Sequence, residues 1–133
     1  MRLTSAALVL VLLALAGCGG SDSSFTDDYN EAVRPLSELG SGLGTKPAAF
    51  ERLARTTAAT RRNLAKLDAP EDAQEEFDAL LGRLDEVTDD LTDVADAERS
   101  RDVVRQRQAA RALVRSSEAV EQAETALKQA VEG

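Results

Sequence analysis

The sequence predicts an all-α protein, an antiparallel helical bundle of three to four helices. The chain of 133 residues is rich in Ala, Leu, Glu, Asp and Arg, and only 3% of it is aromatic, which is typical of such bundles. Apolar residues recur every three or four positions over most of the chain, the period of an amphipathic helix. Glycine and proline gather at a few places, where they separate the predicted helices.

The first helix is expected to begin near Ser24 and to end at the glycine-rich segment 40–44. Pro35 lies inside it and removes one backbone hydrogen bond. The apolar stripe nevertheless continues past Pro35 in phase, so we expect a kink there and not a break. This stripe comprises Phe25, Tyr29, Ala32, Val33, Leu36 and Leu39.

The second helix should start with Thr45 as its N-cap and Pro47 in its first turn. The segment 68–71 is the next junction. Asp68 can serve as the cap of the following helix, and Glu71 can complete a capping box with it. In the second helix, apolar residues and threonines recur in steps of three and four and so form a stripe along one side, which we call a seam. Such a stripe indicates packing against neighbouring helices. The seam comprises Phe50, Leu53, Thr57, Thr60, Leu64 and Leu67.

The third helix has the most regular seam, a heptad pattern widened by Leu81. A second seam follows, but its phase slips between Ala95 and Asp102, so we expect a turn there with Ser100 as cap. The alternative is one long bent helix from Pro70 to Val131. The two seams comprise Ala73, Phe77, Leu80, Leu84, Val87, Leu91 and Val94, and then Val103, Ala110, Leu113, Val120, Leu127 and Val131.

Charge is distributed unevenly among the predicted helices. Between Pro70 and Glu98 there are 12 acidic residues and one basic residue, Arg83. The second helix and the first half of the fourth are basic, which would place an acidic helix between two basic ones. We expect ion pairs between them; the alternative is that the arginines bind an anionic partner. The basic residues are Arg52, Arg55, Arg61, Arg62 and Lys66, and then Arg99, Arg101, Arg105, Arg107, Arg111 and Arg115.

The start of the chain has the three parts of an export signal. Arg2 is followed by the apolar run 8–15 and by small residues before Cys18. This run is too short to span a bilayer comfortably, because a membrane-spanning helix needs about 20 apolar residues. The segment Leu15-Ala16-Gly17-Cys18 resembles the lipobox of bacterial lipoproteins.

This resemblance implies that residues 1–17 are a cleaved signal peptide and that Cys18 is lipidated. It further implies a membrane anchor of acyl chains such as palmitate, in the cell membrane or the outer membrane, on the non-cytoplasmic face. Residues 18–23 would then be the lipidated cysteine with a short flexible tether. The helical bundle domain would be 24–133, and two or three acyl chains would hold it stably. The resemblance covers the first 18 residues only.

Residue types exclude several kinds of chemistry. The chain has no His, and its one cysteine is the predicted lipid site, so neither a Ser-His nor a Cys-His dyad is available. We therefore expect no enzyme, no cofactor and no metal. The acidic residues of the third helix are interpreted as a solvated or ion-paired face and not as a Ca²⁺ or Mg²⁺ site. They are Asp85, Glu86, Asp89, Asp90 and Asp93.

The expected function is that of a binding or scaffolding module of the cell envelope. A net charge of −8 argues against nucleic acid as a partner and against electrostatic adhesion to anionic lipid. The partner is expected to be an envelope protein or a second copy of the chain. The alternative is an envelope carrier or sensor of a small or polymeric ligand.

Overall fold

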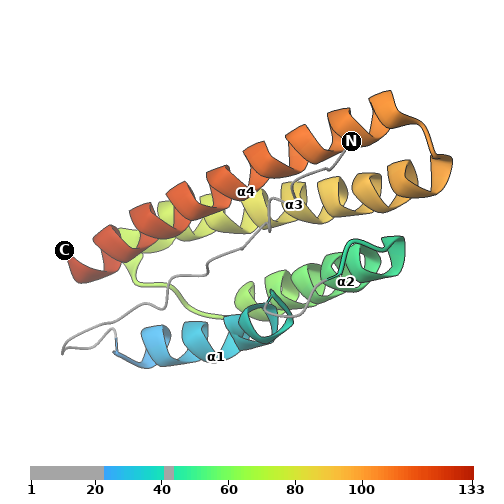
Figure 1. The fold of residues 1–133 in the computed structure, drawn as a ribbon. Helices are drawn as coiled ribbons and strands as arrows, with labels where there is room; N and C mark the ends of the chain where they lie inside the picture. Colours follow the sequence, from blue (N-terminus) through green and yellow to red (C-terminus); the bar gives the residue numbers. More distant parts are fainter. Residues whose placement is uncertain (1–22, 41–43) are drawn as a thin grey trace.

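The computed structural model describes residues 23–40 and 44–133. Within these residues the chain forms helices and no strand, so the all-α prediction is confirmed. Figure 1 shows the helices packed side by side as a bundle. The elements are α1 (Ser23–Gly40), α2 (Pro47–Leu64), the short 3₁₀ helix η1 (Glu71–Ala73), α3 (Gln74–Ser100) and α4 (Val103–Glu132).

The long helices α3 and α4 form an antiparallel hairpin, and α2 packs along α3. The two shorter helices lie beside different parts of this hairpin. In α1, Phe25 stacks edge-to-face on Phe77 near the start of α3, with ring centroids 5.4 Å apart. In α2, Glu51 forms an ion pair with Arg99 near the end of α3. The described part of α1 therefore lies at the end of the hairpin away from the α3–α4 turn.

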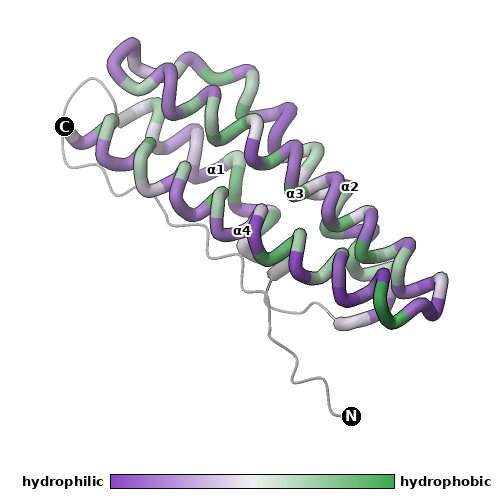
Figure 2. The backbone as a smooth tube through the Cα atoms, turned by 90° about the horizontal axis from the view of Figure 1, so that it is seen from above, coloured by the Kyte–Doolittle hydropathy of each residue, from purple (hydrophilic) through white to green (hydrophobic). Residues whose placement is uncertain are grey.

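All four long helices contribute to the core, and the seams of α3 and α4 meet within it. Leu84 and Leu91 of α3 are buried, as are Leu113, Val120 and Leu127 of α4. Figure 2 shows hydrophobic and hydrophilic segments alternating along the helices, as expected when each helix buries one side. Burying a leucine or valine contributes about 1.5–3 kcal/mol. The predicted antiparallel pairing of these two seams is confirmed.

The predicted turn between the third and fourth helices is also present, so the alternative of one bent helix is wrong. Arg101 has a φ of 58°, the left-handed conformation that commonly ends a helix. The prediction of Ser100 as cap is wrong. Its hydroxyl donates to the Ala97 carbonyl of α3 and accepts from the backbone N–H of Asp102, which lies before α4. The N-cap is Asp102, whose carboxylate accepts from the backbone N–H groups of Val104 and Arg105 at 3.0 and 3.2 Å.

Two other predicted caps are also wrong. The N-cap of α2 is Lys46 and not Thr45, and Pro47 is the first helical residue. Pro70 precedes η1, and neither η1 nor α3 has the side-chain cap expected of Asp68. Proline already has a helical φ and lacks an N–H group. A helix that starts at or just after proline therefore needs a side-chain cap less.

Pro35 lies within α1, which continues through it. The prediction that this proline does not break the helix is therefore confirmed. Its ring is exposed, while Val33 and Leu36 beside it are buried. Packing of these apolar neighbours offsets the hydrogen bond that proline removes.

The predicted seam of α4 is right from Leu113 onward and wrong before it. Val103 and Ala110 are exposed, although both were expected in the core. The error has a simple cause, because a heptad pattern marks which side of a helix is apolar but not whether another helix covers it. The buried residues of α4 are Leu113, Ser116, Ser117, Val120, Glu124 and Leu127.

Candidate interaction surface

The sequence predicts one site residue, Cys18, and it lies outside the described residues. Helix α1 begins at Ser23, five positions later in the sequence. None of the described helices combines the length and the apolar character needed to cross a bilayer. A functional surface among the described residues therefore lies on the bundle.

Exposed large apolar side chains are concentrated in the first half of α4. Val103, Val104 and Val114 are 61%, 62% and 42% exposed. Among the described residues, these are the large hydrophobic side chains that remain exposed. Single exposed valines are ordinary, but a cluster on one helix indicates an interaction site.

Two of these valines, Val103 and Val114, line an open groove of about 460 Å³. Ala110 lies between them on the same side of α4, and Glu98 joins from the end of α3. The lining is mostly apolar at its base and charged at its rim. We call this feature the α4 groove; its lining residues are Glu98, Val103, Gln106, Arg107, Ala110, Arg111, Val114 and Arg115.

The arginines of α4 do not pair with α3. Arg105, Arg107, Arg111 and Arg115 are exposed, and in the part of the chain that the structure describes none of them forms an ion pair within 4.0 Å. The prediction of such pairs is therefore wrong for α4. The side of α4 that faces α3 holds apolar and small residues such as Leu113, whereas the arginines of the groove lie on the exposed side.

Of the five basic residues predicted for the second helix, Arg61 alone forms an ion pair with α3 among the described residues. Arg61 Nε lies 3.2 Å from an oxygen of Asp85 on α3, although its N–H is not aimed at the carboxylate, so this contact is an ion pair and not a hydrogen bond. Arg99 also reaches back from α3 to Glu51. The hydrogen bond from Arg99 holds the pKa of Glu51 below its ordinary value. Charge pairing thus links α2 and α3.

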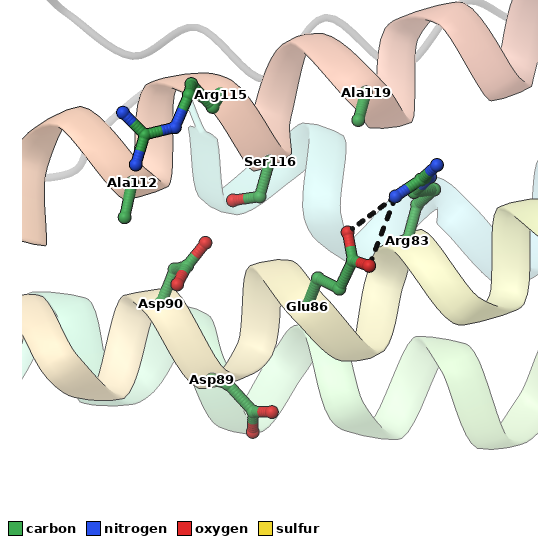
Figure 3. A pocket seen from close by; sticks show the side chains of 8 residues that line it. All are labelled: Arg83, Glu86, Asp89, Asp90, Ala112, Arg115, Ser116 and Ala119. Atoms are coloured by element: carbon green, nitrogen blue, oxygen red, sulfur yellow. Dashed lines mark hydrogen bonds and ion pairs between the residues drawn. The ribbon is translucent and has the colours of Figure 1, made fainter.

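A second groove lies between α3 and α4 on the acidic side (Figure 3), also with a volume of about 460 Å³. Arg83 bonds to Glu86 on its own helix at 3.0 Å. Figure 3 shows Asp90 directed toward α4 and Asp89 directed away from it. Within the described residues, no three acidic or other metal-binding side chains converge on one point.

A buried polar pair joins α1 to α4, and sequence reasoning missed it. The Tyr29 hydroxyl donates to Glu124 Oε1 at 3.2 Å, and both side chains are buried. Burial, with the Glu124 carboxyl adding to it, raises the pKa of Tyr29 far above its ordinary value. Glu124 stands four residues after Val120 and three before Leu127, both of which are predicted seam residues. That spacing was the signal that could have placed it in the core.

Comparisons with known proteins give no relative from which a function could be transferred. No family profile, no curated protein and no solved structure matches the chain.

Proposed function

We propose that this protein is a lipid-anchored binding or scaffolding module of the bacterial cell envelope, without catalytic chemistry. The anchor would be Cys18, on the non-cytoplasmic face of the membrane. The observation that carries the proposal is the α4 groove, where exposed valines lie beside arginines that have no ion-pair partner in the described residues. An exposed apolar surface with a charged rim is typical of protein-binding sites.

The position of the groove supports this role. Figure 1 shows the start of α1 at one end of the bundle and the α3–α4 turn at the other. Phe77, which contacts α1, and Ser100 at the turn are separated by 23 residues of α3, or about 35 Å of helix. Because Cys18 precedes α1 by only a few residues, an anchor there would hold one end of the bundle near the membrane. The bundle could then present the groove away from the bilayer.

The anchor can be tested by changing Cys18→Ser and fractionating cells. We expect the variant to remain unprocessed or to appear in the soluble fraction, because the thiol is the acceptor of the lipid. A variant that stays in the membrane at mature size would show that Cys18 is not the anchor.

Binding can be tested by placing a photo-crosslinking amino acid at Val114 in intact cells. We expect crosslinks from this position to one defined envelope protein. Arg62, exposed on α2, is the control position and should give none of that product. An identical product from both positions, or none from Val114, would contradict binding through the groove.

A second candidate function is a carrier of an anionic envelope polymer. The observation that favours it is the row Arg107, Arg111 and Arg115, none of which forms an ion pair within 4.0 Å among the described residues. A polymer with phosphate or carboxylate groups would suit these arginines. Crosslinks from Val114 to a non-protein polymer, in place of a protein, would support this function.

A further inference from the structure

We infer that the α4 groove receives a helix of another protein, and that this helix has an apolar face bordered by Asp or Glu. This inference rests on the proposed binding function and specifies the chemistry of its partner. It is carried by the shape of the groove, by the spacing of its apolar residues and by the charges along its rim.

The groove has the dimensions of a helix-binding site. Val103, Ala110 and Val114 stand at positions i, i+7 and i+11 of α4, so they lie on one side of the helix over about 16 Å. This spacing is the one with which a helix packs alongside another helix. Apolar side chains from about three turns of a partner helix would cover the valines, in the manner of helix-in-groove recognition.

The charged side chains that line the groove are three arginines and Glu98, so the groove is positive on balance and favours a negatively charged partner. Arg107, Arg111 and Arg115 are spaced four residues apart, so their like charges repel one another weakly along the helix. Carboxylates on a partner would relieve this repulsion and could accept paired hydrogen bonds from each guanidinium. Because the whole chain has a net charge of −8, this basic row is a local feature, and it would orient an acidic helix on the groove.

A second copy of the chain does not fit these requirements. Among the described residues, the exposed large hydrophobic side chains belong to α4 itself, so two copies joined through them would bring arginines against arginines. The acidic helix α3 cannot serve as the partner either, because its leucines, including Leu84 and Leu91, are buried in the core. The occupant is therefore a different protein.

An anionic membrane surface would also attract exposed valines and arginines. The residues that line the groove distinguish a membrane surface from a partner helix. Val103 and Val104 are equally exposed, but only Val103 lines the groove. Insertion into a flat bilayer would use both valines, whereas a helix lying in the groove would contact Val103 alone. The groove is also concave, which suits a ridge of side chains better than a plane of lipid headgroups.

The test uses a designed probe on the full protein, purified from membranes and reconstituted in phosphatidylcholine vesicles. The probe is a fluorescent helical peptide with leucines at heptad positions and glutamates on both flanks. A matched peptide has lysine in place of every glutamate. Binding is followed by fluorescence anisotropy, with empty vesicles as blank. We expect the acidic peptide to bind, the basic peptide to bind at least about tenfold more weakly, and added salt to weaken the acidic peptide's binding.

Variants of the protein then locate the binding site. The pair Arg107→Glu with Arg111→Glu should weaken binding of the acidic peptide by at least about tenfold, and Val103→Ser by about three- to tenfold, since each removes one contact of the groove. The matched controls are Arg62→Glu on α2 and Val104→Ser, both exposed and outside the groove. Each control should change the affinity by less than about twofold.

Three results would overturn the inference. One is equal binding of the acidic and basic peptides, and another is the same loss of binding for Val103→Ser and Val104→Ser. The third is clustering with added phosphatidylglycerol vesicles that depends on both valines, which would identify a membrane surface as the occupant. If the peptide fails but crosslinks from Val114 still recover one envelope protein, the partner chemistry is wrong while the binding function stands. If both fail, the binding function fails as well.

Discussion

In the second half of α4, Val120 and Leu127 are 1% and 0% exposed, whereas in the first half Val103 and Val114 are 61% and 42% exposed. Both halves belong to one continuous helix and both lie along α3. The difference in exposure arises on the side of the α3–α4 hairpin where α1 lies. Near the second half lies α1, whose Tyr29 reaches Glu124 of α4. The valines of the first half have no such cover among the described residues.

This comparison shows how one helix can supply both core and binding surface. A repeating apolar pattern stabilises the fold where another helix covers it and becomes an interaction surface where none does. The charges follow the same division. The arginines lie in the exposed first half, and the second half buries a carboxyl group against a tyrosine instead.

The largest expected effect is a difference in the free energy of unfolding between substitutions in the two halves of α4. Leu127→Ala in the buried half should lower the free energy of unfolding by about 2–5 kcal/mol, because it deletes buried apolar groups and leaves a cavity. Val104→Ala in the exposed half should change it by less than about 0.5 kcal/mol. Urea unfolding followed by circular dichroism measures both. Similar losses for the two variants would mean that Val104 also lies in a packed core.

The next effect concerns the contact that joins α1 to the second half. Tyr29→Phe removes the hydroxyl that donates to Glu124 and should cost about 1–3 kcal/mol, because a buried acceptor loses a partner. The same urea unfolding measures it. Combining this change with Glu124→Gln completes a double-mutant cycle, in which a coupling of about 0.5–3 kcal/mol is expected. Additive losses would show that the two side chains do not interact.

The raised pKa of Tyr29 also predicts that the free energy of unfolding depends on pH in the alkaline range. Its folded-state pKa is raised, so above about pH 10 the unfolded chain releases this proton while the folded chain keeps it. The stability due to Tyr29 is therefore present below about pH 10 and falls as the pH rises further, by up to about 1.4 kcal/mol per pH unit.

This dependence is directly measurable because the chain has one tyrosine. The near-ultraviolet absorbance of tyrosinate reports Tyr29 alone, and it should appear only when the protein unfolds. Tyr29→Phe is the control and should lack this part of the alkaline loss of stability. A titration of tyrosine in the still-folded protein near pH 10 would contradict its burial.

The smallest predicted effect concerns the start of the exposed half. Asp102→Ala removes the side-chain cap of α4 and should cost about 1 kcal/mol. Ser100→Ala is the informative control, because Ser100 was expected to be the cap and is not. Thermal unfolding of both variants should show the larger decrease for Asp102→Ala. The reverse order would restore Ser100 as the cap.

The sequence by itself determined the fold class, the helices and most of the core. The seams of α3 and of the later part of α4 could be predicted because their buried positions hold large apolar residues such as Leu84 and Leu127. The turn between α3 and α4 could be placed although it has neither glycine nor proline, because the phase of the apolar pattern slips there. The prediction that Cys18 carries a lipid also rests on the sequence alone, because a segment that resembles a lipobox is a linear signal and Cys18 lies outside the described residues.

Only the tertiary structure decided which apolar residues form the candidate site. Val103 and Val120 have the same side chain, and both lie on predicted seam positions. The 17 residues between them place the two side chains about 100° apart around α4, so Val120 faces the core and Val103 does not. The same reason explains Arg107 and Arg111, whose charges suited pairing with α3 but which lie on the other side of α4. Heptad spacing indicates which residues share a side of a helix, whereas packing between distant segments determines which side is exposed to solvent.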